Sequence, residues 1–384
     1  MHFQLTEDLT MIRDMAASFA ATELAPHAEQ WDREKHLDRG VFEKAAALGF
    51  LGIYIPEDDG GTGLSRLASA MVFEELAAGD VSHTAMMTIH NMATWMIASY
   101  AGDDLKSRYV PRLVAGELIA SYCLTEPGAG SDAASLSTKA VRATNDKGGD
   151  DYVLNGAKQF ISGAGWSDVY VVMARTSDDG ARGVSCFVVD KDMPGVSFGP
   201  PERKMGWHAQ PTAQVIFEDA RVPAANRVGA EGDGFRFAMS GLDGGRINIG
   251  ACSLGGAAAA LRLATDYAKE RKQFGKPIAD FQNTQFRLAD MATELEASQL
   301  MIYSAADALD HKVPNAGMKC AMAKRFATDL CSKIANDALQ VHGGYGYLAD
   351  YQVERIVRDL RVHQILEGTN DIMRVIISRG LLRQ

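Results

Sequence analysis

The chain has 384 residues, 47% hydrophobic and 23% charged, and a formal net charge of −10. This length allows two or three domains with a large core, and the composition is that of a soluble globular protein. The acidic balance argues against a nucleic-acid-binding surface, which needs a basic stripe. Five scattered cysteines without a Cys-x-x-Cys pair indicate reduced thiols, so we expect neither a disulfide framework nor a metal site.

The N-terminus, Met1–Asp8, has neither the basic and apolar regions of a signal peptide nor an Arg-rich transit helix. We therefore expect a cytoplasmic protein, although the mature form of a mitochondrial matrix protein fits the same residues. The longest weakly polar run, 247–260, consists mostly of Gly and Ala. It is too short to span a bilayer, so we expect close helix packing there and no membrane segment.

Residues 1–120 are predicted to form an N-terminal helical domain. Thr6 can cap a helix whose apolar stripe then follows helical spacing at Leu9, Ile12, Met15, Ala16 and Phe19. Two further apolar runs, 71–78 and 83–100, have helical character. The segment 56–63 between them and the first helices is rich in Gly and Asp, which indicates a loop.

Residues 121–230 are predicted to form a central β domain. β-Branched or alternating runs at 168–175, 183–190 and 213–217 are separated by turn residues. The dipeptide Asn155-Gly156, flanked by apolar residues, predicts a β-hairpin.

Residues 231–384 are predicted to form a C-terminal helical bundle. Two stripes at three- and four-residue spacing suggest antiparallel helices; the second consists of Met318, Met322, Phe326, Leu330 and Ile334. Gly343 and Gly344 are expected to end this second helix. The sequence therefore predicts an α+β multidomain protein.

No dinucleotide-binding or P-loop pattern is present. Gly128-Ala129-Gly130 comes closest to Gly-x-Gly-x-x-Gly, but Ala133 occupies the third glycine position. A nicotinamide site of the Rossmann type is therefore unsupported. The composition of this loop indicates a turn. The alternative is a nest of backbone amides that binds an anion.

Glu367 is the most informative single residue. Ile365 and Leu366 precede it and Gly368 follows. A carboxylate in an apolar cleft has a raised pKa, which suits a general base. The alternative is a surface glutamate at a helix start capped by Thr369 or Asn370.

Three separated segments together resemble the acyl-CoA dehydrogenase family over nearly the whole chain. They are 122–132, 340–347 with Asp350, Arg355 and Asp359, and 361–371. The resemblance implies an N-terminal helical domain, a central β-barrel-like domain and a C-terminal four-helix bundle. It also implies the α,β-dehydrogenation of an acyl-CoA with FAD.

By this resemblance, Leu124 and Thr125 meet the flavin ring, Ser131 contacts pyrophosphate or the acyl-CoA, Phe160 lies against the flavin and Ser162 bonds near N5. Taken alone, Phe160 would be a core strand residue. Arg271 grips the FAD of a neighbouring subunit; its alternative is a solvated face. The full set of FAD-binding residues that the resemblance implies is Cys123, Leu124, Thr125, Gly130, Ser131, Phe160, Ile161, Ser162, Arg271, Gln273, Phe274, Phe281, Gln282, Gln340, Val341, His342, Gly343, Gly344, Thr369, Asn370 and Asp371.

The resemblance makes Glu367 the catalytic base that takes the α-proton. Some family members carry the base elsewhere, at a position that matches Gly245 here, which has no side chain. The alternative for Asp243 and Arg246 is a helix-surface pair three residues apart. The residues expected to bind the acyl-CoA are Ser131, Asp243, Gly244, Gly245, Arg246 and Arg374.

Within the family, segments 89–92, 160–165, 244–249 and 376–379 are similar to those of members that oxidise isobutyryl-CoA to methacrylyl-CoA in valine breakdown. The resemblance implies an electron-transferring flavoprotein as acceptor and a homotetramer built as a dimer of dimers. Alternatives are a straight short-chain or 2-methylbutyryl-CoA dehydrogenase. An acyl-CoA oxidase and a DNA-binding relative fit less well; the net charge disfavours the latter.

Overall fold

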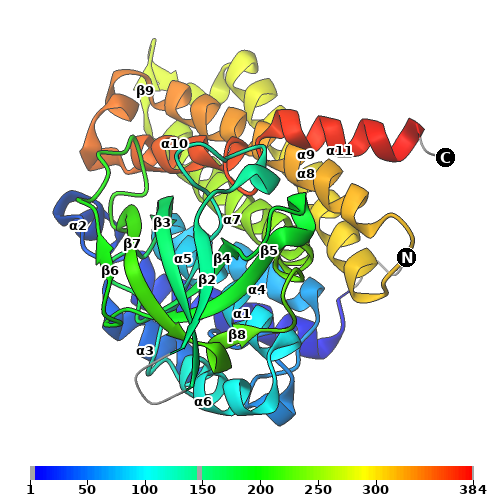
Figure 1. The fold of residues 1–384 in the computed structure, drawn as a ribbon. Helices are drawn as coiled ribbons and strands as arrows, with labels where there is room; N and C mark the ends of the chain where they lie inside the picture. Colours follow the sequence, from blue (N-terminus) through cyan, green and yellow to red (C-terminus); the bar gives the residue numbers. More distant parts are fainter. Residues whose placement is uncertain (1–4, 145–148, 383–384) are drawn as a thin grey trace.

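The computed structural model describes residues 5–144 and 149–382. Helices come first along the chain, a β-sheet follows, and helices return (Figure 1). In Figure 1 the C-terminal helices lie above the green sheet, and the N-terminal helices lie behind and below it. Residues 1–4, on which the expectation about targeting partly rests, lie outside the described residues.

The N-terminal helices are α1 (Glu7–Phe19), α2 (Ala28–Glu34), α3 (Arg39–Ala47), α4 (Arg66–Gly79), α5 (Val81–Tyr100) and α6 (Asp103–Val114). The predicted cap at Thr6 is confirmed, because its hydroxyl accepts the Leu9 N–H at 3.3 Å. α4 and α5 are buried along most of their length, and both pack on the first C-terminal helix. α5 also packs on β1 (Ala120–Cys123) and β4 (Val169–Arg175) of the sheet, so it links the sheet to the helices of the C-terminal domain.

The central sheet consists of β1 (Ala120–Cys123), β2 (Lys139–Thr144), β3 (Asp150–Ser162), β4 (Val169–Arg175), β5 (Val184–Asp190), β6 (Val196–Phe198), β7 (Thr212–Pro223) and β8 (Arg227–Val228). The strand order is β6-β7-β3-β2-β4-β5-β8, and β1 pairs in parallel with β4. Among the described strands β6 and β8 remain as the two ends of this order. The central domain is thus an eight-stranded sheet that does not close into a barrel.

The predicted hairpin at Asn155-Gly156 is wrong. β3 runs straight through both residues and pairs with β7, with a register shift between Leu154 and Gly156. The Asn155 amide group exchanges hydrogen bonds with Asp219 of β7, at 2.9 and 3.0 Å. Gly156 has φ +145° and lies so close to Thr138, the residue before β2, that a Cβ would lie 2.6 Å from the Thr138 hydroxyl. The glycine therefore marks a β-bulge and not a turn.

The C-terminal domain contains α7 (Gly234–Glu270), β9 (Lys272–Gln273), β10 (Lys276–Pro277), α8 (Gln282–Asp310), α9 (Ala316–His342), α10 (Val353–Arg361) and α11 (Asn370–Leu382). α7, α8 and α9 pack on one another, and α10 and α11 pack on α9. α9 ends at His342, and Gly343 has φ +61°, as the predicted stop requires. α7 is long and apolar enough to cross a membrane, but 78% of its most apolar window is buried inside the protein. It is accordingly the central helix of the core.

A buried ion pair and a buried hydrogen bond join the three domains. The Arg355 guanidinium of α10 donates to the Asp80 carboxylate at the start of α5 at 2.7 Å, and both are almost fully buried. The Asp359 carboxylate of α10 accepts the Trp207 N–H from the segment between β6 and β7 at 2.5 Å. α10 is therefore held against both other domains, and it leads directly into the segment that carries Glu367.

Candidate active site

Glu367 lies between α10 and α11 in a left-handed backbone conformation. Its φ is +56°, and that of Gly368 is +87°. This conformation is unfavourable for a glutamate and persists only where the surroundings hold it. The surface alternative does not describe Glu367 itself, because the residue is half-buried and its Oε2 atom is buried. Thr369 does cap α11, because its hydroxyl accepts the Ile372 N–H at 3.2 Å.

The Glu367 side chain is half-buried, and one of its carboxylate oxygens lacks a partner. Its Oε2 is buried and has no hydrogen-bond partner among residues 5–144 and 149–382. Burial raises the pKa of Glu367 to about 7, and the nearby cations Arg246 and Lys324 offset only part of that rise. A carboxyl group with such a pKa exchanges its proton near neutral pH, as a general base must.

Gly245 of α7 makes the space for this carboxylate. A Cβ at Gly245 would lie 2.5 Å from Oε2 of Glu367 and 3.2 Å from Sδ of Met92. A Cβ at Gly244 would lie 2.6 Å from the Arg66 guanidinium. Two consecutive glycines on α7 thus allow two charged side chains to approach the helix backbone.

Arg246 links α7 to the segment of Glu367. Its guanidinium donates to the Asp243 carboxylate at 2.5 Å, and its Nε donates to the Glu367 carbonyl at 3.4 Å. Arg246 is almost fully buried, so the surface-pair alternative does not describe it. Arg374, in contrast, is exposed and pairs with Asp371 at 3.1 Å.

Lys324 of α9 is a site residue that the sequence reasoning missed. Its buried ammonium donates to the carbonyl of Gly368 and to Oδ1 of Asn370, both at 2.9 Å. The pKa of Lys324 is lowered to about 8 because burial disfavours its charge. The amide of Asn370 also donates to Asp329 at 2.7 Å, so its side chain is used within the chain.

A small-residue pattern could have revealed Lys324. The deepest face of α9 carries Cys320, Ala323, Lys324, Ala327 and Cys331, whereas the larger residues of the predicted stripe are mostly half-buried. A lysine within a stripe of Ala and Cys at helical spacing has to be buried and therefore needs polar partners.

The predicted flavin residues of the central domain lie together. A register shift between Lys158 and Ile161 leaves Phe160 with φ +57° and 63% exposed, so it is not a core strand residue. The Gln159 N–H donates to the Thr125 carbonyl at 2.8 Å, which places the loop after β1 beside Phe160. Cys123, Leu124 and Ile161 are buried, Thr125 and Ser162 are half-buried, and Gly130 and Ser131 are exposed.

A buried ion pair fixes this loop to β3. Lys158 donates to Glu126 at 2.7 Å and to the Leu124 carbonyl at 3.2 Å. The Glu126 carboxylate also accepts the N–H groups of Ser137 and Thr138 at 2.6 and 3.0 Å. These donors and Lys158 lower the pKa of Glu126 to about 2, despite its burial.

The predicted FAD residues between Arg271 and Gly344 form a second group at the far end of the C-terminal helices, whereas Thr369, Asn370 and Asp371 lie at the start of α11, next to Glu367. The β9–β10 turn, at the top of Figure 1, carries Phe274, which is 94% exposed. The Arg271 guanidinium lies 5.3 Å from the ring centre of Tyr345, beside the loop that follows α9. Gln273, Gln282, Gln340, Gly343 and Gly344 are exposed, Arg271, Phe281 and Val341 are half-buried, and His342 is buried.

Both groups fit a large aromatic dinucleotide. Each offers an exposed aromatic ring beside backbone and polar groups, and the second adds a cation for a phosphate. Near the first group, the Tyr122 hydroxyl is buried without a hydrogen-bond partner in the described part of the chain. These features are those of surfaces that another molecule covers.

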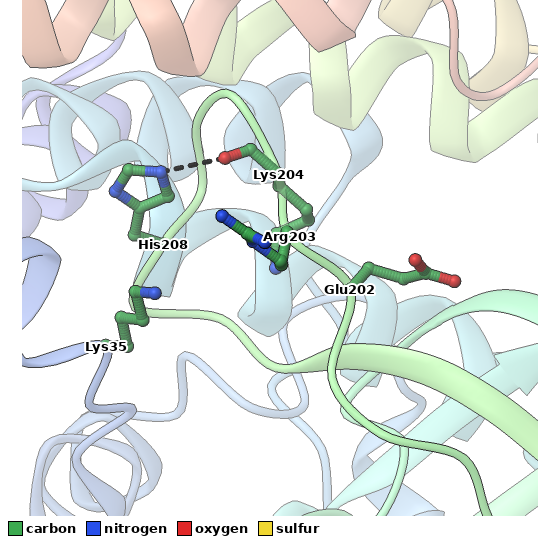
Figure 2. A pocket seen from close by; sticks show the side chains of 5 residues that line it. All are labelled: Lys35, Glu202, Arg203, Lys204 and His208. Carbon is green, nitrogen blue, oxygen red and sulfur yellow. Dashed lines mark hydrogen bonds between the residues drawn. The ribbon is translucent and has the colours of Figure 1, made fainter.

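A separate, positively charged cavity of about 360 Å³ lies beside the strand of Phe160 (Figure 2). It is lined by Lys35, Glu202, Arg203, Lys204 and His208. The Glu202 carboxylate points away from the other four side chains and accepts the Gln159 amide at 2.6 Å. Within the described residues, this cavity shares no hydrogen bond with Glu367.

Comparison with known families matches all three parts of the chain. The acyl-CoA dehydrogenase N-terminal domain matches residues 6–117, the middle domain residues 121–220 and the C-terminal domain residues 232–382. The chain is 56% identical to the mitochondrial isobutyryl-CoA dehydrogenase of Dictyostelium discoideum and 55% identical to that of Bos taurus. The alignments cover 98% and 99% of this chain and 90% of each relative.

Solved structures agree over the full length. The butyryl-CoA dehydrogenase of Megasphaera elsdenii superposes with a TM-score of 0.95 at 37% identity. A chain from the structural work on the electron transferring flavoprotein of Acidaminococcus fermentans superposes with 0.96 at 43%, and both superpositions cover 100% of both chains. The FAD complex of PigA superposes with 0.94 at 33% identity, again over 100% of both chains. This chain therefore belongs to the acyl-CoA dehydrogenase family and is a flavin-dependent oxidoreductase with FAD as its cofactor.

Proposed function

We propose that the protein oxidises isobutyryl-CoA to methacrylyl-CoA, a step in valine breakdown. Two relatives at 55–56% identity bear the name isobutyryl-CoA dehydrogenase, and each aligns with nearly the whole chain. The reaction removes the α-hydrogen as a proton and the β-hydrogen as a hydride, and it leaves a double bond between the two carbons.

Glu367 is the proposed base, and its carboxylate is the observation that carries the proposal. Its Oε2 is buried without a hydrogen-bond partner in the described part of the chain, and its pKa is raised to about 7. Gly245 leaves the space in front of it free of side chains. Arg246 and Lys324 hold the backbone on either side of it, through the carbonyls of Glu367 and Gly368. The carboxylate therefore meets the substrate at a defined position.

When bound, FAD supplies the oxidant that accepts the β-hydride. Thr125, Ser131, Phe160 and Ser162 hold it in the central domain. The backbone N–H of Glu367 is proposed to donate to the thioester oxygen, where negative charge develops as the α-proton leaves. Asp243 and Arg246 bind the pantetheine arm, and the buried site excludes water.

The second group of FAD residues, around Arg271, is proposed to serve a neighbouring subunit. It lies beside β9 at the end of the C-terminal helices, whereas β3, the strand that contains Phe160, belongs to the central sheet (Figure 1). A homotetramer that shares each flavin between two subunits accounts for both groups. Electrons are proposed to pass to an electron-transferring flavoprotein, the protein for which one of the solved structures above is named.

A panel of acyl-CoA substrates with an artificial electron acceptor tests the substrate. We expect kcat/KM for isobutyryl-CoA to exceed that for butyryl-, 2-methylbutyryl-, isovaleryl- and octanoyl-CoA. The α-methyl group must fit beside Glu367 while the α-hydrogen still points at the carboxylate. If another of these substrates is preferred by more than tenfold, the isobutyryl assignment fails and the dehydrogenase assignment stands.

A further inference from the structure

Arg66 is a buried cation that has no counter-ion among the described residues. It is the first residue of α4 and only 9% exposed. Its guanidinium carbon lies 3.6 Å from the ring centre of Tyr54 and 5.0 Å from that of Trp95. In the part of the chain that the structure describes, no carboxylate lies within 4.0 Å of it. Two aromatic rings are thus its main partners. A contact between a cation and an aromatic face stabilises the cation by about 0.5–2 kcal/mol.

The position of Arg66 is electrostatically unfavourable. The N-terminus of a helix carries positive partial charge, which repels a cation. The Asp310 carboxylate offsets this by accepting the N–H groups of Arg66 and Leu67, at 2.8 and 3.1 Å. An apolar side chain at this position would avoid that electrostatic cost. The simplest explanation for the arginine is therefore that its charge has a function.

Arg66 and Glu367 approach neighbouring positions of α7. A Cβ at Gly244 would lie 2.6 Å from the guanidinium, and a Cβ at Gly245 would lie 2.5 Å from the carboxylate. Tyr54 is close enough to both charges to be affected by each of them. Burial raises the pKa of Tyr54, Arg66 lowers it and Glu367 raises it. Arg66, from α4 and beside Trp95 of α5, therefore approaches α7 at the residue that precedes the one approached by the proposed base.

We propose that Arg66 is a specificity-determining residue that closes the acyl-binding side of the site and restricts it to short acyl chains. A chain whose α-carbon lies at Glu367 and whose tail runs along α7 meets the guanidinium after a few methylenes. A longer apolar tail would then have to displace the cation from its aromatic partners or strip it of its remaining water. The inference rests on the proposed acyl-CoA dehydrogenation at Glu367.

The test compares FAD-loaded Arg66→Met, Arg66→Gln and Arg66→Lys with the unsubstituted enzyme. The readout is the ratio of kcat/KM for hexanoyl-CoA to that for isobutyryl-CoA. We expect the two neutral variants to raise this ratio at least tenfold and the lysine variant to change it much less. The control, exposed Arg33→Met, should leave it unchanged. A ratio within threefold of the original in both neutral variants overturns the proposal.

Two further measurements separate the possible outcomes. Calorimetric binding of hexyl-CoA, a thioether that cannot react, should tighten in Arg66→Gln, and this readout also decides the question if a variant is inactive. Glutaryl-CoA tests whether the guanidinium instead binds a carboxylate at the tail. The length-limiting role is overturned if the unsubstituted enzyme prefers glutaryl-CoA to hexanoyl-CoA and the Arg66→Gln variant no longer oxidises glutaryl-CoA. If isobutyryl-CoA is not the best substrate but the ratio still shifts, the substrate proposal fails and the role of Arg66 stands.

Discussion

At the scale of single residues, the environment of Glu367 decides what its carboxylate can do. Burial raises its pKa to about 7, and Arg246 and Lys324 keep it from rising further. Both cations also bind the backbone beside it, so the same two side chains set the position and the basicity of the group. Position and basicity should therefore respond together when either cation is changed.

The variant Glu367→Gln should lose turnover while it retains FAD and acyl-CoA binding, because the amide keeps the shape but cannot accept the α-proton. Turnover is measured with an artificial electron acceptor, FAD content from the absorbance spectrum, and binding by titration with isobutyryl-CoA. Activity within about tenfold of the original, or 1.4 kcal/mol in barrier, would show that another group is the base.

The acid limb of the profile of kcat/KM against pH should lie near pH 7, since only the ionised carboxylate accepts a proton. Activity should thus rise with pH through this range, whereas the contribution of Glu367 to folding stability should fall. A carboxyl group whose pKa is raised from 4.5 to about 7 by folding stabilises the fold below pH 4.5, and this contribution is lost as pH rises through 7.

Glu367→Gln should therefore melt at a higher temperature than the original enzyme at pH 8.5, with a smaller difference at pH 5. The upper limit of the effect is on the order of 3 kcal/mol. Thermal melts of both FAD-loaded proteins at the two pH values provide the check. An equal difference at both values would mean that folding does not shift this pKa.

At the scale of elements, α7 brings the charged groups together because it lacks side chains where they lie. Gly245→Ala would place a Cβ 2.5 Å from the Glu367 carboxylate. The end of that side chain can move, so the fold should survive while the base is displaced. A displacement of about an ångström could cost on the order of a hundredfold in kcat.

The matched control for this substitution is Gly102→Ala. Gly102 precedes α6 with φ −72°, and a Cβ added there would meet no atom within 4 Å among the described residues. The control should leave both FAD content and kcat unchanged. Equal kcat in the Gly245→Ala and control variants would show that the carboxylate does not need this space.

The loop after β1 depends on the buried pair Glu126–Lys158. Lys158→Met should leave Glu126 buried and unpaired, which typically costs about 3–5 kcal/mol. The loop that carries Thr125 and Ser131 should loosen, and FAD occupancy should fall. The double variant Glu126→Gln, Lys158→Met removes both charges and should regain part of the stability. FAD content and melting temperature of the three proteins provide the test, and a single variant with unchanged FAD content would contradict it.

At the scale of the whole molecule, most of the predicted FAD residues form two groups on different domains, each with an exposed aromatic ring at Phe160 or Phe274. Arg271→Ala should lower FAD occupancy and loosen the oligomer if its ligand belongs to another subunit. Mass in solution, measured by light scattering with and without added FAD, tests this, and exposed Arg182→Ala is the control. If the Arg271→Ala variant keeps full FAD occupancy and an unchanged mass, Arg271 is only a solvated surface charge.

Much of the fold could be predicted from local patterns. The strands at 169–175 and 184–190, the cap at Thr6 and the end of α9 at His342 follow from short-range preferences, and the structure confirms them. The prediction of a hairpin at Asn155-Gly156 was wrong because a long-range contact overrode the local preference. Local turn preference predicted it, but pairing with the distant strand β7 converted the dipeptide into a bulge.

The sequence by itself determined the family and the cofactor, because the motifs around Glu126, Gly343 and Glu367 carry their information in residue type and order. Only the tertiary structure showed that Gly245 holds open the space for the Glu367 carboxylate, that Lys324 and Arg246 fix its backbone, and that Arg66 lies beside it. These residues come from different helices, and their roles depend on burial and on distances of a few ångströms. Such quantities arise only when α4, α7 and α9 pack together, so no local pattern contains them.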